Sequence, residues 1–229
     1  MEQLIFNLPG DWTHPYLLFR LLEVVGSPWQ GTEDGFIDLE TGDRVTLAVG
    51  RRVEHLAEAF ASATDPSRTP LSDAMLEALD AHQLVFQVQG DRGDDELLGL
   101  RATLRATNAV VDGGATAVQC VQSHLVHEAD AFQALMKDVE AAGNDREALK
   151  QAMYRVVVRY QFGKQPMTFG MSYLGLPDLV VLKPMIADRA IGRLERAAME
   201  PDLLDRAVED SRGLPEPVRN PYGVVIISA

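Results

Sequence analysis

The fold class is decided by residues 83–121, which read QLVFQVQGDRGDDELLGLRATLRATNAVVDGGATAVQCV. Leu84, Phe86 and Val88 recur at a period of two, which is typical of a strand with one strongly apolar face. Three acidic residues then favour the start of a helix, and a Gly-Gly pair ends it before a second strand at Ala117–Val121. A strand, a helix and a strand of this length predict a right-handed crossover between parallel strands.

Hydrophobic periodicity extends the prediction outward from this unit. Upstream it predicts strands at 4–8, 36–39 and 45–49, and helices at 16–25, 51–64 and after an N-cap at Ser72. Downstream it predicts helices at 128–139, 145–153, 184–199 and 202–210, and strands at 154–162, 167–173 and 224–227.

One downstream segment fits two interpretations. Leu149, Met153 and Tyr160 belong to one helical face, whereas Val156, Val158, Tyr160 and Phe162 alternate as in a strand. Three consecutive valines favour the strand, so we expect the helix to end near Met153.

Together these elements predict an α+β fold. We expect a mixed sheet with at least one βαβ crossover (about 83–121), a hairpin (about 154–173) and helices packed on the sheet. The most linker-like stretch, Asp65–Pro70, has the length of a loop, so residues 1–229 are expected to form a single domain.

Charge and cysteine content narrow the classes of partner and the compartment. The chain has 21 Lys and Arg against 34 Asp and Glu, a net charge of −13. An acidic surface disfavours nucleic acid and anionic lipid, because both are bound mainly by cationic side chains. The single cysteine, Cys120, indicates a reducing compartment, and the sequence shows neither a signal peptide nor an apolar run long enough to span a bilayer. We therefore expect a cytoplasmic protein with neither a nucleic-acid nor a membrane partner.

The histidine pair His124 and His127 is the strongest hint of chemistry. Histidines at i and i+3 can share a helix face and bind a metal, and Glu128 follows directly. The zincin pattern spaces its histidines by four, however, and no third ligand is identifiable. Cys120 could pair with His124 as a thiolate, although a cysteine in an apolar strand is more often a small core residue. We assign no catalytic, cofactor-binding or metal-binding residue here, and expect no cofactor.

Three glycine-containing stretches miss the motifs that they approach. Residues 170–175 (GMSYLG) place the second glycine one position too late for a nucleophile elbow. Gly163-Lys164 lacks the remaining residues of a phosphate loop, and residues 90–93 lack the third glycine of a dinucleotide fingerprint.

The helix predicted at Tyr16–Val25 carries only Arg20 and Glu23 as charged residues and lies between Trp12 and Trp29. Such a helix is either deeply buried or covered by a partner, and the tryptophans fit an interface or an ordinary core. The leading hypothesis is a non-enzymatic, protein-binding or accessory factor of the immunity-like kind that binds another protein or a second copy through residues 16–25. The alternative is a small-molecule hydrolase that uses His124 or His127 with Glu128 or Asp178.

Two stretches resemble an uncharacterised, mainly bacterial family, domain of unknown function 4261. They are residues 81–88 (AHQLVFQV), with the elements that follow them up to His127, and residues 168–178 (TFGMSYLGLPD). The resemblance covers about residues 45–181 and implies strands at 154–162 and 167–173. Asp178 departs from the glutamate expected in much of that family. The family has no known activity, so the resemblance implies no function.

Overall fold

The structure is a computed structural model that describes residues 3–22, 27–62, 70–91, 94–162, 166–181, 187–200 and 225–227. Its larger sheet has seven strands in the order β2-β3-β4-β5-β1-β6-β7, and each neighbouring pair is antiparallel. These strands are β1 (Leu4–Gly10), β2 (Trp29–Gly31), β3 (Gly35–Asp38), β4 (Arg44–Arg51), β5 (Leu84–Gly90), β6 (Ala117–Cys120) and β7 (Leu125–Glu128).

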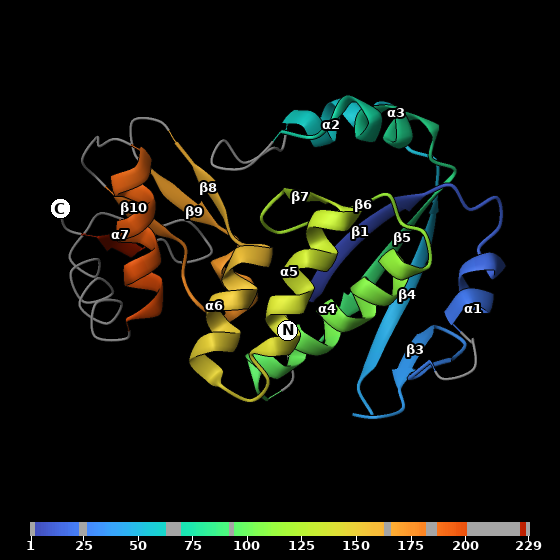
Figure 1. The fold of residues 1–229 in the computed structure, drawn as a ribbon, viewed down its shortest axis with the longest axis horizontal. Helices are drawn as coiled ribbons and strands as arrows, with labels where there is room; N and C mark the ends of the chain where they lie inside the picture. Colours follow the sequence, from blue (N-terminus) through green and yellow to red (C-terminus); the bar gives the residue numbers. More distant parts are fainter. Residues whose placement is uncertain are drawn as a thin grey trace.

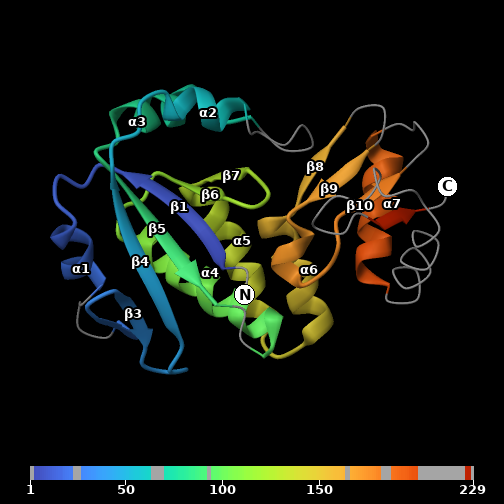
Figure 2. The same ribbon diagram turned by 180° about the vertical axis from the view of Figure 1, so that it is seen from behind.

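The described helices cover this sheet unevenly. They are α1 (Tyr16–Leu22), α2 (Leu56–Ser62), α3 (Asp73–Ala81), α4 (Glu96–Asp112), α5 (Ala129–Ala141), α6 (Arg146–Val157), α7 (Ala187–Met199) and the 3₁₀ helix η1 (Met171–Leu174). Helices α4 and α5 lie across one face of the sheet, and α2 and α3 lie along one end of the strands (Figures 1 and 2). From the back, β4, β5 and β1 lie in front of α4 and α5 (Figure 2).

A second, smaller sheet lies beyond α6, next to α7 (Figure 1). Its strands are β8 (Arg159–Gln161), β9 (Met167–Phe169), β10 (Leu179–Val181) and β11 (Val225–Ile227), in the order β11-β10-β9-β8. β10 and β11 are parallel, whereas β8 and β9 form the antiparallel hairpin predicted within residues 154–173. The α+β class is therefore confirmed.

The predicted crossover at 83–121 is present with one difference. β5 and β6 each pair antiparallel with β1, so they run in the same direction, but β1 lies between them. Helix α4 therefore connects parallel strands that are not neighbours. The sequence does not reveal this insertion because β1 lies more than seventy residues away in the chain.

Several predicted boundaries were wrong. Helix α6 continues to Val157 instead of ending near Met153, because Val156 and Val157 are fully buried by the helical packing, which outweighs the strand propensity of valine. Strand β9 ends at Phe169 and is followed by η1. Helix α2 begins at Leu56, since β4 extends to Arg51.

Other strands escaped prediction. β7 is buried on both faces, with Leu125 in the main core and Val126 in the cluster under α2 and α3, so it shows no alternation. β2 and β10 have three residues each, too few for a periodic signal. The helix predicted at 202–210 and the residues 23–25 of the first predicted helix lie outside the described residues.

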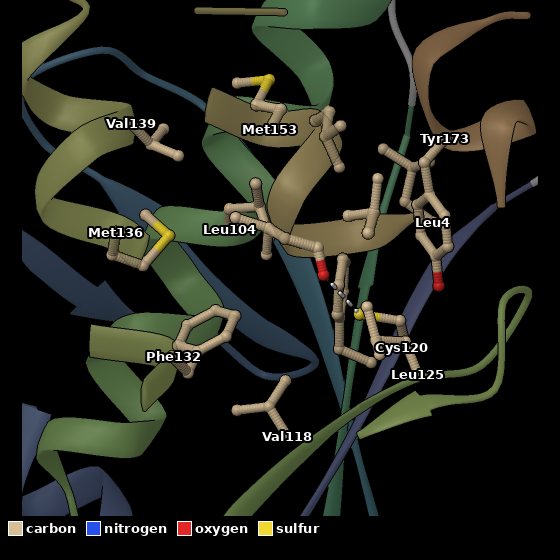
Figure 3. Close-up of a cluster of buried hydrophobic side chains, with 14 of the residues drawn as sticks. Leu4, Leu104, Val118, Cys120, Leu125, Phe132, Met136, Val139, Met153 and Tyr173 are labelled. Carbon is tan, nitrogen blue, oxygen red and sulfur yellow. Dashed lines mark hydrogen bonds between the residues drawn. The ribbon is translucent and has the colours of Figure 1, made fainter. Parts of the chain in front are cut away.

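The main core lies between the large sheet and the helices α4, α5 and α6. Leu4 of β1, Leu104 of α4 and Phe132 of α5 are fully buried there, and Figure 3 shows them within one cluster that also contains Cys120 and Tyr173. Each such side chain stabilises the fold by about 1.5–3 kcal/mol relative to exposure. Among the helices that the structure describes, none is long and apolar enough to cross a bilayer.

Candidate interaction surface around helix α1

Four histidines, His14, His82, His124 and His127, do not come together in one site. His14 is exposed, and its Nδ1 accepts the backbone N–H of Tyr16 at 3.1 Å, at the start of α1. His82 is buried at the end of α3, where its Nε2 accepts the N–H of Val53 at 3.0 Å. Its Nδ1 therefore carries the hydrogen and donates it to the carbonyl of Leu79.

His124 and His127 do not share a helix face, so that premise was wrong. His124 is exposed in the turn between β6 and β7, with a left-handed φ of 56°, whereas His127 is buried in β7. The Nε2 of His127 donates to the carbonyl of Val156 at 2.7 Å, which satisfies an orphan carbonyl in the last turn of α6.

Cys120 serves the same helix end. Its Sγ lies 3.5 Å from the Val156 carbonyl oxygen, the contact drawn as a dashed line in Figure 3. The thiol is fully buried among Leu4, Leu104 and Leu125, so its role here is that of a small core residue.

Asp178 and the glycine stretch 170–175 form one structural unit. Gly170 and Gly175, both with positive φ, flank η1, so the stretch is a 3₁₀ turn rather than a nucleophile elbow. The Asp178 carboxylate accepts the N–H of Met171 at 3.1 Å and lies 3.4 Å from the Thr168 hydroxyl. Burial raises the pKa of Asp178 to about 6, although these hydrogen bonds act to lower it.

No group of three or more His, Cys, Asp or Glu side chains among the described residues could hold a metal ion. The concave features of interest lie elsewhere, around α1 and the C-terminal end of α4. Two of them meet at Gly113, which lines both.

The first feature is a hollow of about 750 Å³ beside α1. It is lined by Asp11, Trp12, Tyr16, Leu17, Arg20, Gly113 and Gly114. Leu18, on the other side of α1, is fully buried, while Tyr16 and Leu17 remain 56% and 45% exposed. Helix α1 is therefore anchored by one face and presents apolar side chains on another.

Trp12, which lines this hollow, is held by a hydrogen bond and a ring contact. Trp12 is buried, its Nε1 donates to the Gly113 carbonyl at 2.8 Å, and its ring packs edge-on against Phe86 at a centroid distance of 4.9 Å. A Cβ on Gly113 would lie 2.5 Å from Cδ1 of Leu18, so α1 approaches α4 this closely because residue 113 is glycine.

The second feature is a groove of about 700 Å³ between β2, α4 and α5. It is lined by Ser27, Pro28, Trp29, Arg105, Asn108, Ala109, Asp112, Gly113, Gln133, Met136, Lys137 and Glu140. Arg105 of this groove forms ion pairs with three carboxylates: its guanidinium lies 3.0 Å from Asp38, 3.2 Å from Glu40 and 3.6 Å from Glu140.

Comparisons with known proteins identify no relative: no family model matches this chain, and neither a curated protein nor a solved structure is found to be similar. The resemblance to domain of unknown function 4261 therefore stays a prediction.

The sequence pointed to part of this surface. It singled out the helix at 16–25 and its two tryptophans, and both tryptophans are buried, 5% and 8% exposed, as the ordinary-core interpretation expects. It missed the groove. Asn108 and Asp112, spaced by four on one helix, were a signal for one wall, but no local pattern connects them with Gln133 on α5.

Proposed function

We propose that this chain is a non-enzymatic protein-binding factor, of the accessory or immunity-like kind, that works in the cytoplasm. Its docking surface is the α1 surface, which we define as Tyr16, Leu17, Arg20, Trp12 and the Gly113-Gly114 backbone. The observation that carries the proposal is the exposure of Tyr16 and Leu17 on a helix that Leu18 holds in place.

Three properties of this surface fit a protein interface. Tyrosine supplies a large contact area at a small entropic cost, and aromatic side chains are enriched at interface centres. The Arg20 guanidinium lies 5.9 Å from the centre of the Tyr16 ring, which restrains that ring. The adjoining hollow offers a recess into which a partner side chain can insert.

Charge favours a different protein over a second copy. Two chains of net charge −13 repel each other, whereas a basic partner is attracted and steered to the surface. We therefore commit to a protein partner with a basic surface around an apolar centre. The alternative of a hydrolase gains no support from the geometry, since neither His124 nor His127 lines the hollow or the groove.

A photo-crosslinking amino acid at position 17, introduced in the cells that make this protein, tests the proposal. The same crosslinker at Leu39, which is 61% exposed, serves as the control. We expect a partner that is captured from position 17 and not from position 39. Capture from both positions alike would contradict a dedicated surface.

The captured partner is then purified and its affinity measured. The double variant Tyr16→Ser, Leu17→Ser should weaken binding at least tenfold, because exposed aromatic and aliphatic anchors dominate interface energies. The control variant Leu98→Ser, at an exposed leucine of α4, should leave the affinity unchanged. Binding should also weaken with added salt. If light scattering shows a dimer that the double variant no longer forms, the partner is a second copy of this chain and not a different protein.

A further inference from the structure

Asp112 stands in an electrostatically unfavourable position. It is the last residue of the seventeen-residue helix α4, where the helix dipole is negative and a carboxylate is disfavoured. Among the described residues, Asp112 has no cation within ion-pairing distance, in contrast to Glu140 in the same groove, which is paired with Arg101 at 3.2 Å. Within the part of the chain that the structure describes, no ion pair therefore neutralises the negative end of α4.

The Asp112 carboxylate is nevertheless held in a defined orientation. The Nε2 of Gln133 donates to its Oδ1 at 2.7 Å, and the Nδ2 of Asn108 donates to its Oδ2 at 3.2 Å. These amides come from two different helices, and both line the groove. Each carboxylate oxygen keeps a further lone pair for another donor.

The groove also contains a buried acceptor that lacks a donor. The Oδ1 of Asn108 is buried and has no hydrogen-bond partner among the described residues. Buried polar atoms of this kind are rare in native proteins. A cationic ligand with several N–H groups would donate first to the Asp112 carboxylate. After a small rotation of the Asn108 amide it would also donate to the Asn108 Oδ1.

Apolar atoms line the approach to these acceptors. Pro28, Trp29 and Met136 lie along the groove and can pack against the methylene stem of a long side chain, as the stems of Lys and Arg do on apolar surfaces. The Arg105 guanidinium is already engaged by three carboxylates, so Lys137 is the cation of the groove that would oppose a second one.

From this arrangement we infer that the groove receives a basic side chain, arginine or lysine, presented by the protein partner. The inference rests on the proposed function and specifies the partner's chemistry, since the groove continues the α1 surface through Gly113. The carboxylate of Asp112 and the negative end of α4 bind the cationic head, and the apolar lining binds its stem.

The test uses small probes on the whole chain and needs no partner. Isotope-labelled protein is titrated with N-acetyl-arginine amide, N-acetyl-lysine amide and the uncharged isostere N-acetyl-citrulline amide, and NMR shifts are followed. We expect saturable shifts at Gln133 and Gly113 with the arginine or lysine probe. The affinity for the citrulline probe should be at least tenfold weaker. Comparing the first two probes identifies the preferred head group.

Two variants sharpen the result. Asp112→Asn should weaken the cationic probe about tenfold, because a charge-assisted hydrogen bond is lost. Asp188→Asn, at an exposed carboxylate on α7, is the matched control and should have no effect. Lys137→Gln should tighten binding two- to threefold by removing the opposing cation.

Equal affinity for citrulline, shifts that map outside the groove, or an unchanged affinity in Asp112→Asn would each overturn the inference. Stronger binding of N-acetyl-glutamate amide, lost in Lys137→Gln, would show that the groove takes an anion instead. None of these outcomes involves Tyr16 or Leu17, so a failure here is distinguishable from a failure of the proposed function.

Discussion

Replacing Asp178 by asparagine tests whether its buried carboxylate opposes folding at neutral pH. The folded-state pKa of about 6 lies above the ordinary value of 3.8, so the folded protein holds this proton more tightly than the unfolded chain. The resulting stability is fully present below pH 3.8 and is lost as the pH rises to about 6. At pH 7.5 the ionised carboxylate costs about 3 kcal/mol relative to a neutral group, since one pKa unit is worth about 1.4 kcal/mol.

Asparagine stays neutral, and its Oδ1 can still accept the Met171 N–H. We therefore expect Asp178→Asn to raise the free energy of unfolding by up to about 3 kcal/mol at pH 7.5, and by less than about 1 kcal/mol at pH 4. Urea unfolding at both pH values measures this difference. The control is Glu77→Gln, at an exposed carboxylate of α3, which should show no such pH dependence. An equal effect of Asp178→Asn at both pH values would refute the reasoning.

Two further predictions concern buried groups with exposed counterparts. His82→Ala should lower the free energy of unfolding by about 2–3 kcal/mol, because a partly buried backbone donor and a buried acceptor both lose their partner, whereas the exposed His14→Ala should cost less than about 1 kcal/mol. Leu104→Ala should cost about 2–5 kcal/mol by opening a cavity in the main core, against about 0.5 kcal/mol for Leu98→Ala on the exposed side of the same helix. Chemical denaturation checks both pairs, and equal losses within either pair would contradict the burial on which the pair is based.

Elements with a clear pattern among neighbouring residues were predicted well. β5 alternates and α4 has a helical periodicity, while β1 and β6 are short apolar runs next to a Pro-Gly or a Gly-Gly pair. The N-cap at Ser72 is present, where its hydroxyl accepts the N–H of Met75. Such signals depend on neighbours a few residues apart, so one chain is enough to show them.

Elements that depend on distant packing were not predicted. The end of α6 is decided by the burial of Val156 and Val157, and the Val156 carbonyl in its last turn accepts a hydrogen bond from His127, 29 residues earlier in the chain. The histidine pair was considered as a possible site because the sequence does not show that His127 makes this contact. A buried histidine that caps a distant helix and one that binds a ligand have the same sequence signature.

By itself, then, the sequence determined the α+β class, the crossover unit at 83–121 and the acidic charge, because each follows from composition or short-range periodicity. The tertiary structure alone decided three further things: the insertion of β1 between β5 and β6, the exposure of Tyr16 and Leu17 on α1, and the meeting of Asp112 with Gln133. Each of these depends on which segments, distant in the chain, exclude water together. That choice is made by the packing of the whole chain, and no local pattern records it.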